Sequence, residues 1–138
     1  MILIACVEDR MGMMFNHRRL SRDREVVRDI LEMCGAQFLY MEEYSAKLFE
    51  EPETGCLPGN IQITAEIPSG GLKGVYFFTE RPQMIQESLT EKIVLYRWNR
   101  KYPADEFFSI DLSGWKLQNC EEFAGNSHKK ITKEIYGR

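Results

Sequence analysis

Charged side chains that could do chemistry are concentrated in residues 17–24, which read His-Arg-Arg-Leu-Ser-Arg-Asp-Arg, with Arg28 one helical turn further on. Guanidinium groups and free backbone amides at the start of a helix can together bind a phosphate. On this basis Arg18 and Arg19 are candidate anion-binding residues. The same arginines could instead form a solvated surface, balanced by the acidic neighbours Glu25, Asp29 and Glu32. The stretch therefore predicts either an anion site or ordinary charged surface.

A histidine close to an aspartate can also support acid–base chemistry, and His17 and Asp23 both lie in this stretch. Binding of a phosphate ester or of RNA by residues 17–28 is a further hypothesis. It is the weaker one because the chain has 18 Lys and Arg against 21 Asp and Glu, a net charge of −3. An acidic chain has no global attraction to nucleic acid or to an anionic membrane.

The cysteines and histidines do not form a metal-binding pattern. Four widely spaced cysteines contain no C-x-x-C pair: Cys6, Cys34, Cys56 and Cys120. Catalytic zinc sites normally use three or more protein ligands, mostly histidine, and this chain has only His17 and His128. Cys6 and Cys34 lie within apolar patterns, so we expect them to be buried. The sequence therefore predicts no metal site.

Length and composition are those of one folded domain. The 138 residues are too few for two domains of ordinary size, so we expect a single domain over residues 1–138. Hydrophobic residues make up 43% and charged residues 28%, a balance that excludes wholesale disorder. No window approaches eighteen consecutive apolar residues, which is the length that a membrane span requires. We therefore expect a cytoplasmic protein without a membrane partner.

Apolar patterns predict strands and helices in alternation. Continuous apolar runs indicate four buried strands: Met1–Val7, Gln37–Met41, Val75–Phe78 and Lys92–Trp98. A fifth strand is expected over Asn60–Thr64, with Ile61 and Ile63 facing inward. Glu8–Leu20 is expected to be a loop.

Helices are predicted from Ser21, as the N-cap, to a stop at Gly35, then over Glu42–Glu50 and Pro82–Leu89. Trp115–Phe123 and Lys130–Tyr136 alternate apolar and polar residues around a Gly-Asn turn, which predicts a hairpin. This order predicts an α/β fold: a mostly parallel sheet, helices on both faces and a C-terminal antiparallel hairpin.

Short strings in the correct order resemble the dihydrofolate reductase family over nearly the whole chain. The opening ILIACVEDR, followed by Gly12-Met13 and Asn16, resembles that family's first strand and the start of its mobile active-site loop. Leu20 to Asp23 resembles the entrance of its first helix, and residues 57–61 (LPGNI) resemble its turn into a later strand. Residues 75–105 can be laid on the family without a gap. The resemblance implies a dihydrofolate reductase-like fold.

The departures from the family concern mainly its cofactor site. Where the resemblance implies a Gly, then Arg or Lys, then Thr that bind the NADPH phosphates, residues 42–45 read Glu-Glu-Tyr-Ser. Carboxylates beside a phosphate are unfavourable. The family's Gly-Gly pair, which lets backbone amides approach the pyrophosphate, is replaced by residues 78–80, Phe-Thr-Glu. The arginine that clamps the substrate's carboxylate is also missing, as is the proline-tryptophan pair of the active-site loop.

Part of the substrate side survives. The resemblance implies that Asp23 is the acid that hydrogen-bonds a pterin ring, with Tyr96 as its hydrogen-bond partner, and these are the candidate catalytic residues. It also implies that Ala5, Val27 and Phe77 line the ligand pocket. Each has a simpler interpretation: Asp23 as an acid in the first turn of a helix, and the three apolar residues as ordinary core.

Two functions remain open after this comparison. The first is a divergent relative that binds a small molecule or an anion, has lost reductase activity and holds no cofactor. The alternative is an active NADPH-dependent reductase of dihydrofolate or a pterin-like substrate, with altered cofactor contacts. The acidic and bulky residues at the implied cofactor site favour the first function.

Overall fold

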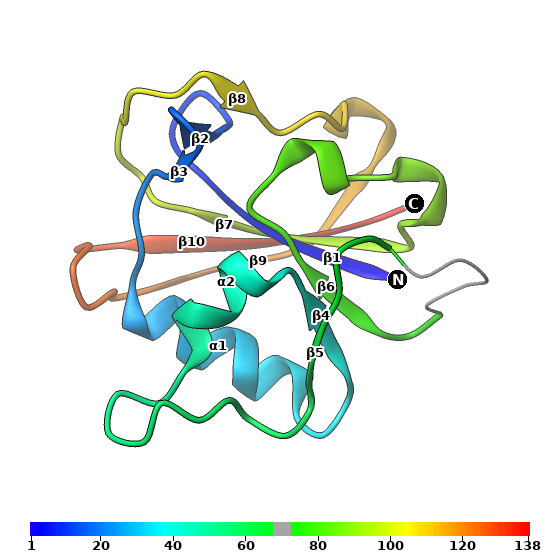
Figure 1. The fold of residues 1–138 in the computed structure, drawn as a ribbon. Coiled ribbons are helices and arrows are strands. Elements are labelled where there is room, and N and C mark those ends of the chain that lie inside the picture. Colours follow the sequence, from blue (N-terminus) through cyan, green and yellow to red (C-terminus); the bar gives the residue numbers. More distant parts are fainter. Residues whose placement is uncertain (68–72) are drawn as a thin grey trace.

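A seven-stranded sheet runs through the computed structural model, which describes residues 1–67 and 73–138 (Figure 1). Its strand order is β5-β4-β6-β1-β7-β10-β9. The bounds along the chain are β1 Ile2–Val7, β4 Leu39–Met41, β5 Ile61–Ile63, β6 Tyr76–Phe78, β7 Lys92–Arg97, β9 Lys116–Phe123 and β10 Ile131–Gly137.

The pairing within this sheet is parallel except at one end. β1 pairs in parallel with β6 and β7, and β4 pairs in parallel with β5 and β6. β10 runs antiparallel to both β7 and β9. The mostly parallel sheet and the C-terminal hairpin are therefore confirmed. The continuous apolar runs of β1 and β7 are explained by their central positions, because both faces of these strands are covered.

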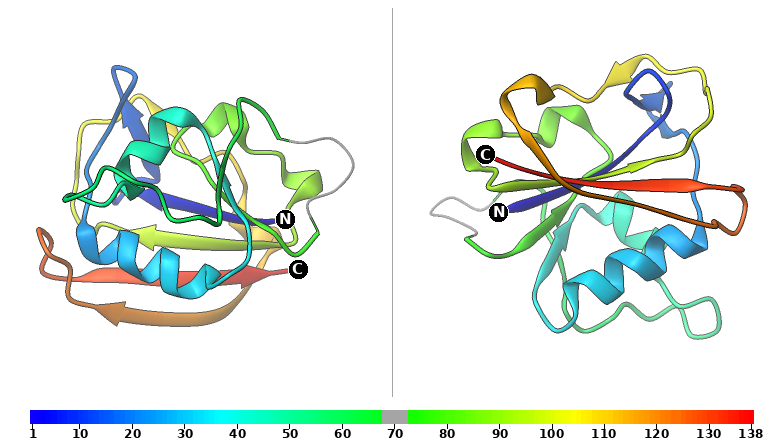
Figure 2. Two further views of the ribbon diagram at one scale, coloured as in Figure 1. Left: turned by 60° about the horizontal axis from the view of Figure 1, so that its bottom comes forward. Right: turned by 180° about the vertical axis from the view of Figure 1, so that it is seen from behind.

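One face of the sheet carries the α-helices. α1 spans Arg24–Cys34, and α2 (Glu43–Ala46) continues into the 3-10 turn η1 (Lys47–Phe49). α1 packs against the sheet through its buried residues Val26, Ile30 and Cys34. It ends at Gly35, as expected, where the backbone takes a φ of 56° that favours glycine. The two views of Figure 2 show α1 lying along one side of the sheet.

The other face is covered by 3-10 turns and a small second sheet. The turns are η2 Pro82–Met84, η3 Glu87–Leu89 and η4 Leu112–Gly114. The small sheet has the order β3-β2-β8, with bounds β2 Gly12–Phe15, β3 Arg18–Arg19 and β8 Glu106–Phe107. The expected loop over residues 8–20 therefore contains a short hairpin. The helix expected over residues 82–89 is two 3-10 turns, because too few apolar residues recur there to sustain α-helical turns.

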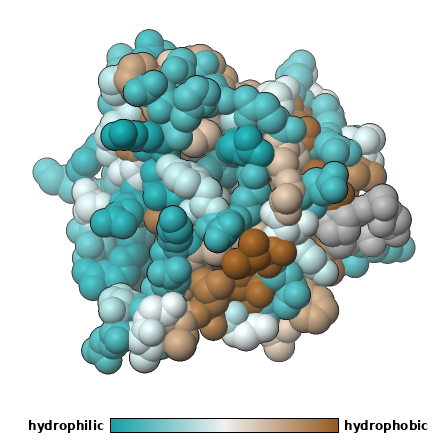
Figure 3. Space-filling model, in the orientation of Figure 1, coloured by the Kyte–Doolittle hydropathy of each residue, from teal (hydrophilic) through white to brown (hydrophobic). Residues whose placement is uncertain are grey.

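The edge strand β5 departs from the expected pattern. Ile61 is buried, but Ile63, expected to face inward, is 53% exposed because β5 forms the outer edge of the sheet. Figure 3 shows a hydrophobic area on an otherwise largely hydrophilic face, near the position of β5 in Figure 1. Within the described residues, none of the helices has the length and apolar character that a membrane crossing requires.

Candidate functional site

A pocket lies between α1 and the helix-bearing face of the sheet. The space between its walls, counted together with open solvent, is about 450 Å³. Its apolar walls come from α1 (Val26, Val27, Ile30), from the end of η1 (Phe49) and from the end of β6 (Phe78). Apolar walls with a few polar groups are typical of small-molecule sites. Its polar lining includes Arg19, Ser21, Arg22, Asp23 and Glu80.

The apolar residues expected in the pocket are divided between the two faces of the sheet. Val27 lines the pocket, whereas Ala5 and Phe77 are buried in the core on the opposite face. Their neighbours Cys6 and Phe78 line the pocket instead. Successive side chains of a strand point to opposite faces, so a shift of one residue exchanges the two cores.

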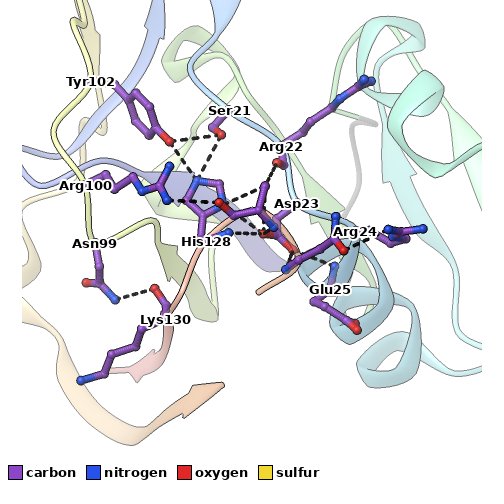
Figure 4. Close-up of polar contacts among 12 residues, drawn as sticks. Ser21, Arg22, Asp23, Arg24, Glu25, Asn99, Arg100, Tyr102, His128 and Lys130 are labelled. Carbon is purple, nitrogen blue, oxygen red and sulfur yellow. Dashed lines mark hydrogen bonds and ion pairs between the residues drawn. The ribbon is translucent and has the colours of Figure 1, made fainter. Parts of the chain in front are cut away.

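Asp23 is buried at the start of α1, where both of its carboxylate oxygens accept several hydrogen bonds (Figure 4). Oδ1 accepts from the backbone N–H of Glu25 at 2.9 Å and of Asn126 at 2.8 Å. Oδ2 accepts from the backbone N–H groups of Ser127 and His128, at 2.8 Å and 3.2 Å. Asp23, rather than the expected Ser21, is therefore the N-cap of α1, because its side chain satisfies the Glu25 N–H.

These hydrogen bonds decide the ionisation of Asp23. Burial alone would raise the pKa of the carboxyl group, but donation from Asn126, His128, Glu25 and Ser127 outweighs it. The pKa of Asp23 is consequently held well below its usual range. Asp23 is an anion at neutral pH, although it is only 3% exposed.

His128 connects Asp23 to two hydroxyl groups. Its Nδ1 lies 2.9 Å from Asp23 Oδ2, and its Nε2 lies 2.9 Å from the Tyr102 hydroxyl and 3.2 Å from Ser21 Oγ. The ring of His128 is buried and stacks on Trp98 with 4.7 Å between ring centroids. Because a carboxylate only accepts, Nδ1 carries the proton, and in the neutral ring Nε2 is then the acceptor. Ser21, Asp23, Tyr102 and His128 are called the Asp23 cluster below.

The Asp23 cluster was only partly visible in the sequence. The sequence points to Asp23, but the histidine that it places near Asp23 is His17, which is exposed in the turn between β2 and β3. His128 reaches Asp23 from 105 residues further along the chain. A separation of that size leaves no local spacing from which the contact could be inferred.

Tyr96 has a different partner from the one expected. Its hydroxyl donates to Asp29 Oδ2 at 2.5 Å instead of to Asp23. Lys133 Nζ approaches the same Asp29 oxygen at 2.8 Å. Burial and the bond to Asp29 raise the pKa of Tyr96. The residue therefore belongs to a separate polar group beneath α1.

The two candidate anion-binding arginines differ in their surroundings. Arg18 is exposed on β3. Arg19 donates to Glu80 twice, from Nε at 2.7 Å and from a terminal nitrogen at 3.0 Å, and its guanidinium lies over the Tyr44 ring. Ser45 Oγ also donates to Glu80, at 2.8 Å. The positive charge of Arg19 is thus already matched by a buried carboxylate.

A second two-point ion pair lies at the start of α2. Arg81 donates from Nε and a terminal nitrogen to the two carboxylate oxygens of Glu42, at 3.0 Å and 2.7 Å. Bidentate arginine–carboxylate pairs combine charge with fixed geometry. The resemblance places cofactor-phosphate contacts at Glu42 and Glu80. Each of these two residues is therefore paired with an arginine.

The cysteines are free thiols. Burial raises the pKa of Cys34 to about 12 and raises that of Cys6 as well, whereas Cys56 and Cys120 are exposed. Over residues 1–67 and 73–138, no three His, Cys, Asp or Glu side chains gather in a way that could hold a metal ion.

Sequence comparisons give no match, either to a protein-family model or to a curated protein. A structural comparison does. Dihydrofolate reductase from Enterococcus faecalis, solved in complex with NADP(H) and RAB-propyl, matches with a TM-score of 0.68 and 13% sequence identity. The match covers 99% of this chain and 95% of that one. The chain therefore has a dihydrofolate reductase-like fold, in a strongly divergent sequence.

Proposed function

We propose that this protein binds a small molecule in the pocket between α1 and the sheet, and that it does not act as an NADPH-dependent reductase. The observation that carries the proposal is the pair of internal ion pairs, Arg19–Glu80 and Arg81–Glu42, at the positions where the resemblance implies the cofactor's phosphates. The residues present do not fit that cofactor.

The electrostatic argument concerns what a phosphate would meet at these positions. Glu80 is 8% exposed and holds Arg19 and Ser45, so a phosphate could recruit Arg19 only by leaving a buried carboxylate without its partner. Breaking a buried ion pair in this way costs about 3–5 kcal/mol. Glu42 would in addition repel the phosphate directly whenever Arg81 turned away from it.

A pterin ring would find no free acceptor at Asp23. Both carboxylate oxygens already accept from the protein's own N–H groups, two at Oδ1 and three at Oδ2 when the His128 ring is included. The groups at the pocket that suit a ligand are the apolar walls and the exposed Arg22. This combination favours a small molecule with an apolar body and a polar or anionic end.

A binding experiment with a filled-pocket variant tests the proposal. The probe is 1-anilinonaphthalene-8-sulfonate, which has an apolar body and one anionic group. Val27→Phe places a larger side chain on the pocket wall, whereas Leu31→Phe makes the same kind of change on α1 outside the pocket lining. We expect the probe to bind wild type and Leu31→Phe alike, and Val27→Phe about tenfold or more weakly, since the ring occupies the space.

The same titrations include NADPH and dihydrofolate, read by fluorescence and by the shift of the unfolding midpoint. Neither is expected to bind in the micromolar range. Micromolar binding of NADPH would contradict the proposal and restore the reductase alternative. Equal probe binding by Val27→Phe and Leu31→Phe would instead remove the pocket as the binding site.

A further inference from the structure

The Asp23 cluster contains a serine of the pocket lining, a histidine in contact with its hydroxyl and a buried carboxylate behind that histidine. We propose that Ser21 is a nucleophile for acyl transfer from small apolar esters, with His128 as its general base and Asp23 as the group that orients His128. This inference rests on the proposed ligand pocket, because the ester must bind there to reach Ser21.

The geometry meets the requirements of an activated serine. A nucleophile and its base need to lie within about 2.6–3.2 Å, with a third group orienting the base. Ser21 Oγ lies 3.2 Å from His128 Nε2, and Asp23 Oδ2 lies 2.9 Å from Nδ1 on the opposite side of the ring. The three side chains and their contacts can be followed in Figure 4.

The surroundings hold His128 in one orientation. The ring is buried, stacks on Trp98, and its own backbone N–H donates to the same Asp23 oxygen as Nδ1. Asp23 is fixed in turn by the N–H groups of Glu25 and Asn126. Nε2 therefore keeps its lone pair directed at the hydroxyl groups beside the pocket, as a general base requires.

Tyr102 is a second hydroxyl group in contact with His128 Nε2. Its hydroxyl lies 2.9 Å from Nε2 and 3.4 Å from Ser21 Oγ, so it competes with Ser21 for the same lone pair. When Tyr102 donates to Ser21 Oγ instead, Ser21 is free to donate to Nε2. Removal of the Tyr102 hydroxyl consequently leaves Nε2 to Ser21 alone.

The proposed reaction needs no cofactor. Ser21 Oγ forms a bond to the ester carbonyl carbon while its proton passes to His128 Nε2 and the π electron pair of the C=O bond moves onto the carbonyl oxygen. The C=O double bond then re-forms, the bond from that carbon to the alcohol oxygen breaks, and the proton on Nε2 passes to the departing alcohol. Water repeats the same steps on the acyl-serine, which releases the acid and restores the hydroxyl.

A covalent probe tests the proposal directly. Diisopropyl fluorophosphate phosphorylates an activated serine: the Ser21 Oγ–P bond forms, the P–F bond breaks, fluoride leaves and His128 accepts the proton. We expect the folded protein to be labelled at Ser21, as located by peptide mass spectrometry. Ser21→Ala should lose the label, while Ser88→Ala, a change at an exposed serine of η3, should keep it.

Two further variants separate activation from simple exposure. His128→Gln should slow labelling by about 100-fold or more, the usual contribution of a positioned general base. Tyr102→Phe should label at least as fast as wild type. Far-ultraviolet circular dichroism checks that each variant is folded. If His128→Gln does not fold, the proposal is tested by whether the label on wild type is at Ser21.

The results also distinguish this inference from the proposed function. Wild type that binds the anilinonaphthalene probe but is not labelled at Ser21 would overturn the nucleophile and leave the pocket in place. Labelling at the same rate in folded His128→Gln would equally overturn it. Loss of both probe binding and labelling would contradict the pocket itself.

Discussion

Asp23 joins two segments that are far apart in the sequence. Its carboxylate caps α1 through Glu25 and also accepts from the backbone of Asn126, 103 residues away, in the turn between β9 and β10. Buried N–H groups that lose their acceptor each cost about 1–3 kcal/mol. One side chain thus fixes the start of a helix and a distant turn, and through His128 it also fixes the side of the pocket where Ser21 lies.

The ionisation of Asp23 predicts how stability depends on pH. Its pKa in the folded state lies below the ordinary value, so its contribution is complete above the unfolded pKa of about 3.9 and is lost as the pH falls further. Asp23→Asn should lower the free energy of unfolding at pH 7 by about 1–3 kcal/mol. Its stability should then fall less steeply than that of wild type below about pH 4. Urea unfolding at pH 7 and pH 3 measures both effects.

Asp111→Asn is the control for this change. Asp111 also accepts a backbone N–H, from Ser113, but it is exposed at the surface. We expect its substitution to alter stability much less than Asp23→Asn. Equal pH dependence in wild type and Asp23→Asn would show that the buried carboxylate does not stabilise the fold in its charged form.

At the level of single residues, the sequence predicted positions better than partners. Asp23 and Val27 both line the pocket. Their positions at the start of the first helix are predictable because that helix has a clear local pattern. Ala5 and Phe77 are expected in the pocket lining, but their chain neighbours Cys6 and Phe78 line it. Strand periodicity shows which residues share a face of the sheet, but not which of the two faces meets the pocket. His128 was not assigned to the site because only the folded sheet brings the last turn against α1.

The turn between β9 and β10 approaches Asp23 so closely that a side chain would not fit at Gly125. A Cβ atom there would lie 2.6 Å from Asp23 Oδ2 and 2.7 Å from the carbonyl oxygen of His128. Gly125→Ala should therefore lower the unfolding free energy by about 1–3 kcal/mol. Thermal unfolding gives the loss of stability, and the rate of Ser21 labelling should fall with it.

Gly114→Ala provides the matched comparison. A Cβ atom at Gly114 would meet no atom within 4 Å, so this change should shift stability by less than about 0.5 kcal/mol. If the two alanine variants are equally stable, the turn moves away from Asp23 without cost. The close packing would then not be what holds the Asp23 cluster together.

At the level of elements, the long apolar runs were predictable and the short segments were not. β1 and β7 formed where continuous apolar residues indicated central strands. The segment over residues 82–89 has only brief helical periodicity, and it packs as two 3-10 turns. The β2–β3 hairpin forms within an expected loop, where β2 also pairs with β8 from a distant part of the chain. The secondary structure of such short segments is determined by contacts that form only in the folded state.

The molecule as a whole is organised as two cores on one sheet. Leu3 points into the core beneath the small sheet and the 3-10 turns, while its neighbour Ile4 points into the core beneath α1. Every central strand contributes to both cores in this alternating way. Loss of either core would uncover one face of the shared strands, so we expect the two cores to unfold together, as the single domain predicted over residues 1–138 requires.

The two tryptophans allow each core to be observed separately. Trp98 is buried in the core beneath α1 and Trp115 in the core on the opposite face, and the chain has no other tryptophan. Trp115→Phe therefore leaves a reporter of the first core, and Trp98→Phe leaves a reporter of the second. In each variant, the urea midpoint from tryptophan fluorescence should coincide with that from far-ultraviolet circular dichroism, since the sheet is common to both cores. A fluorescence midpoint below the circular dichroism midpoint in one variant would mean that this core opens while the sheet persists, and that the chain is not a single cooperative unit.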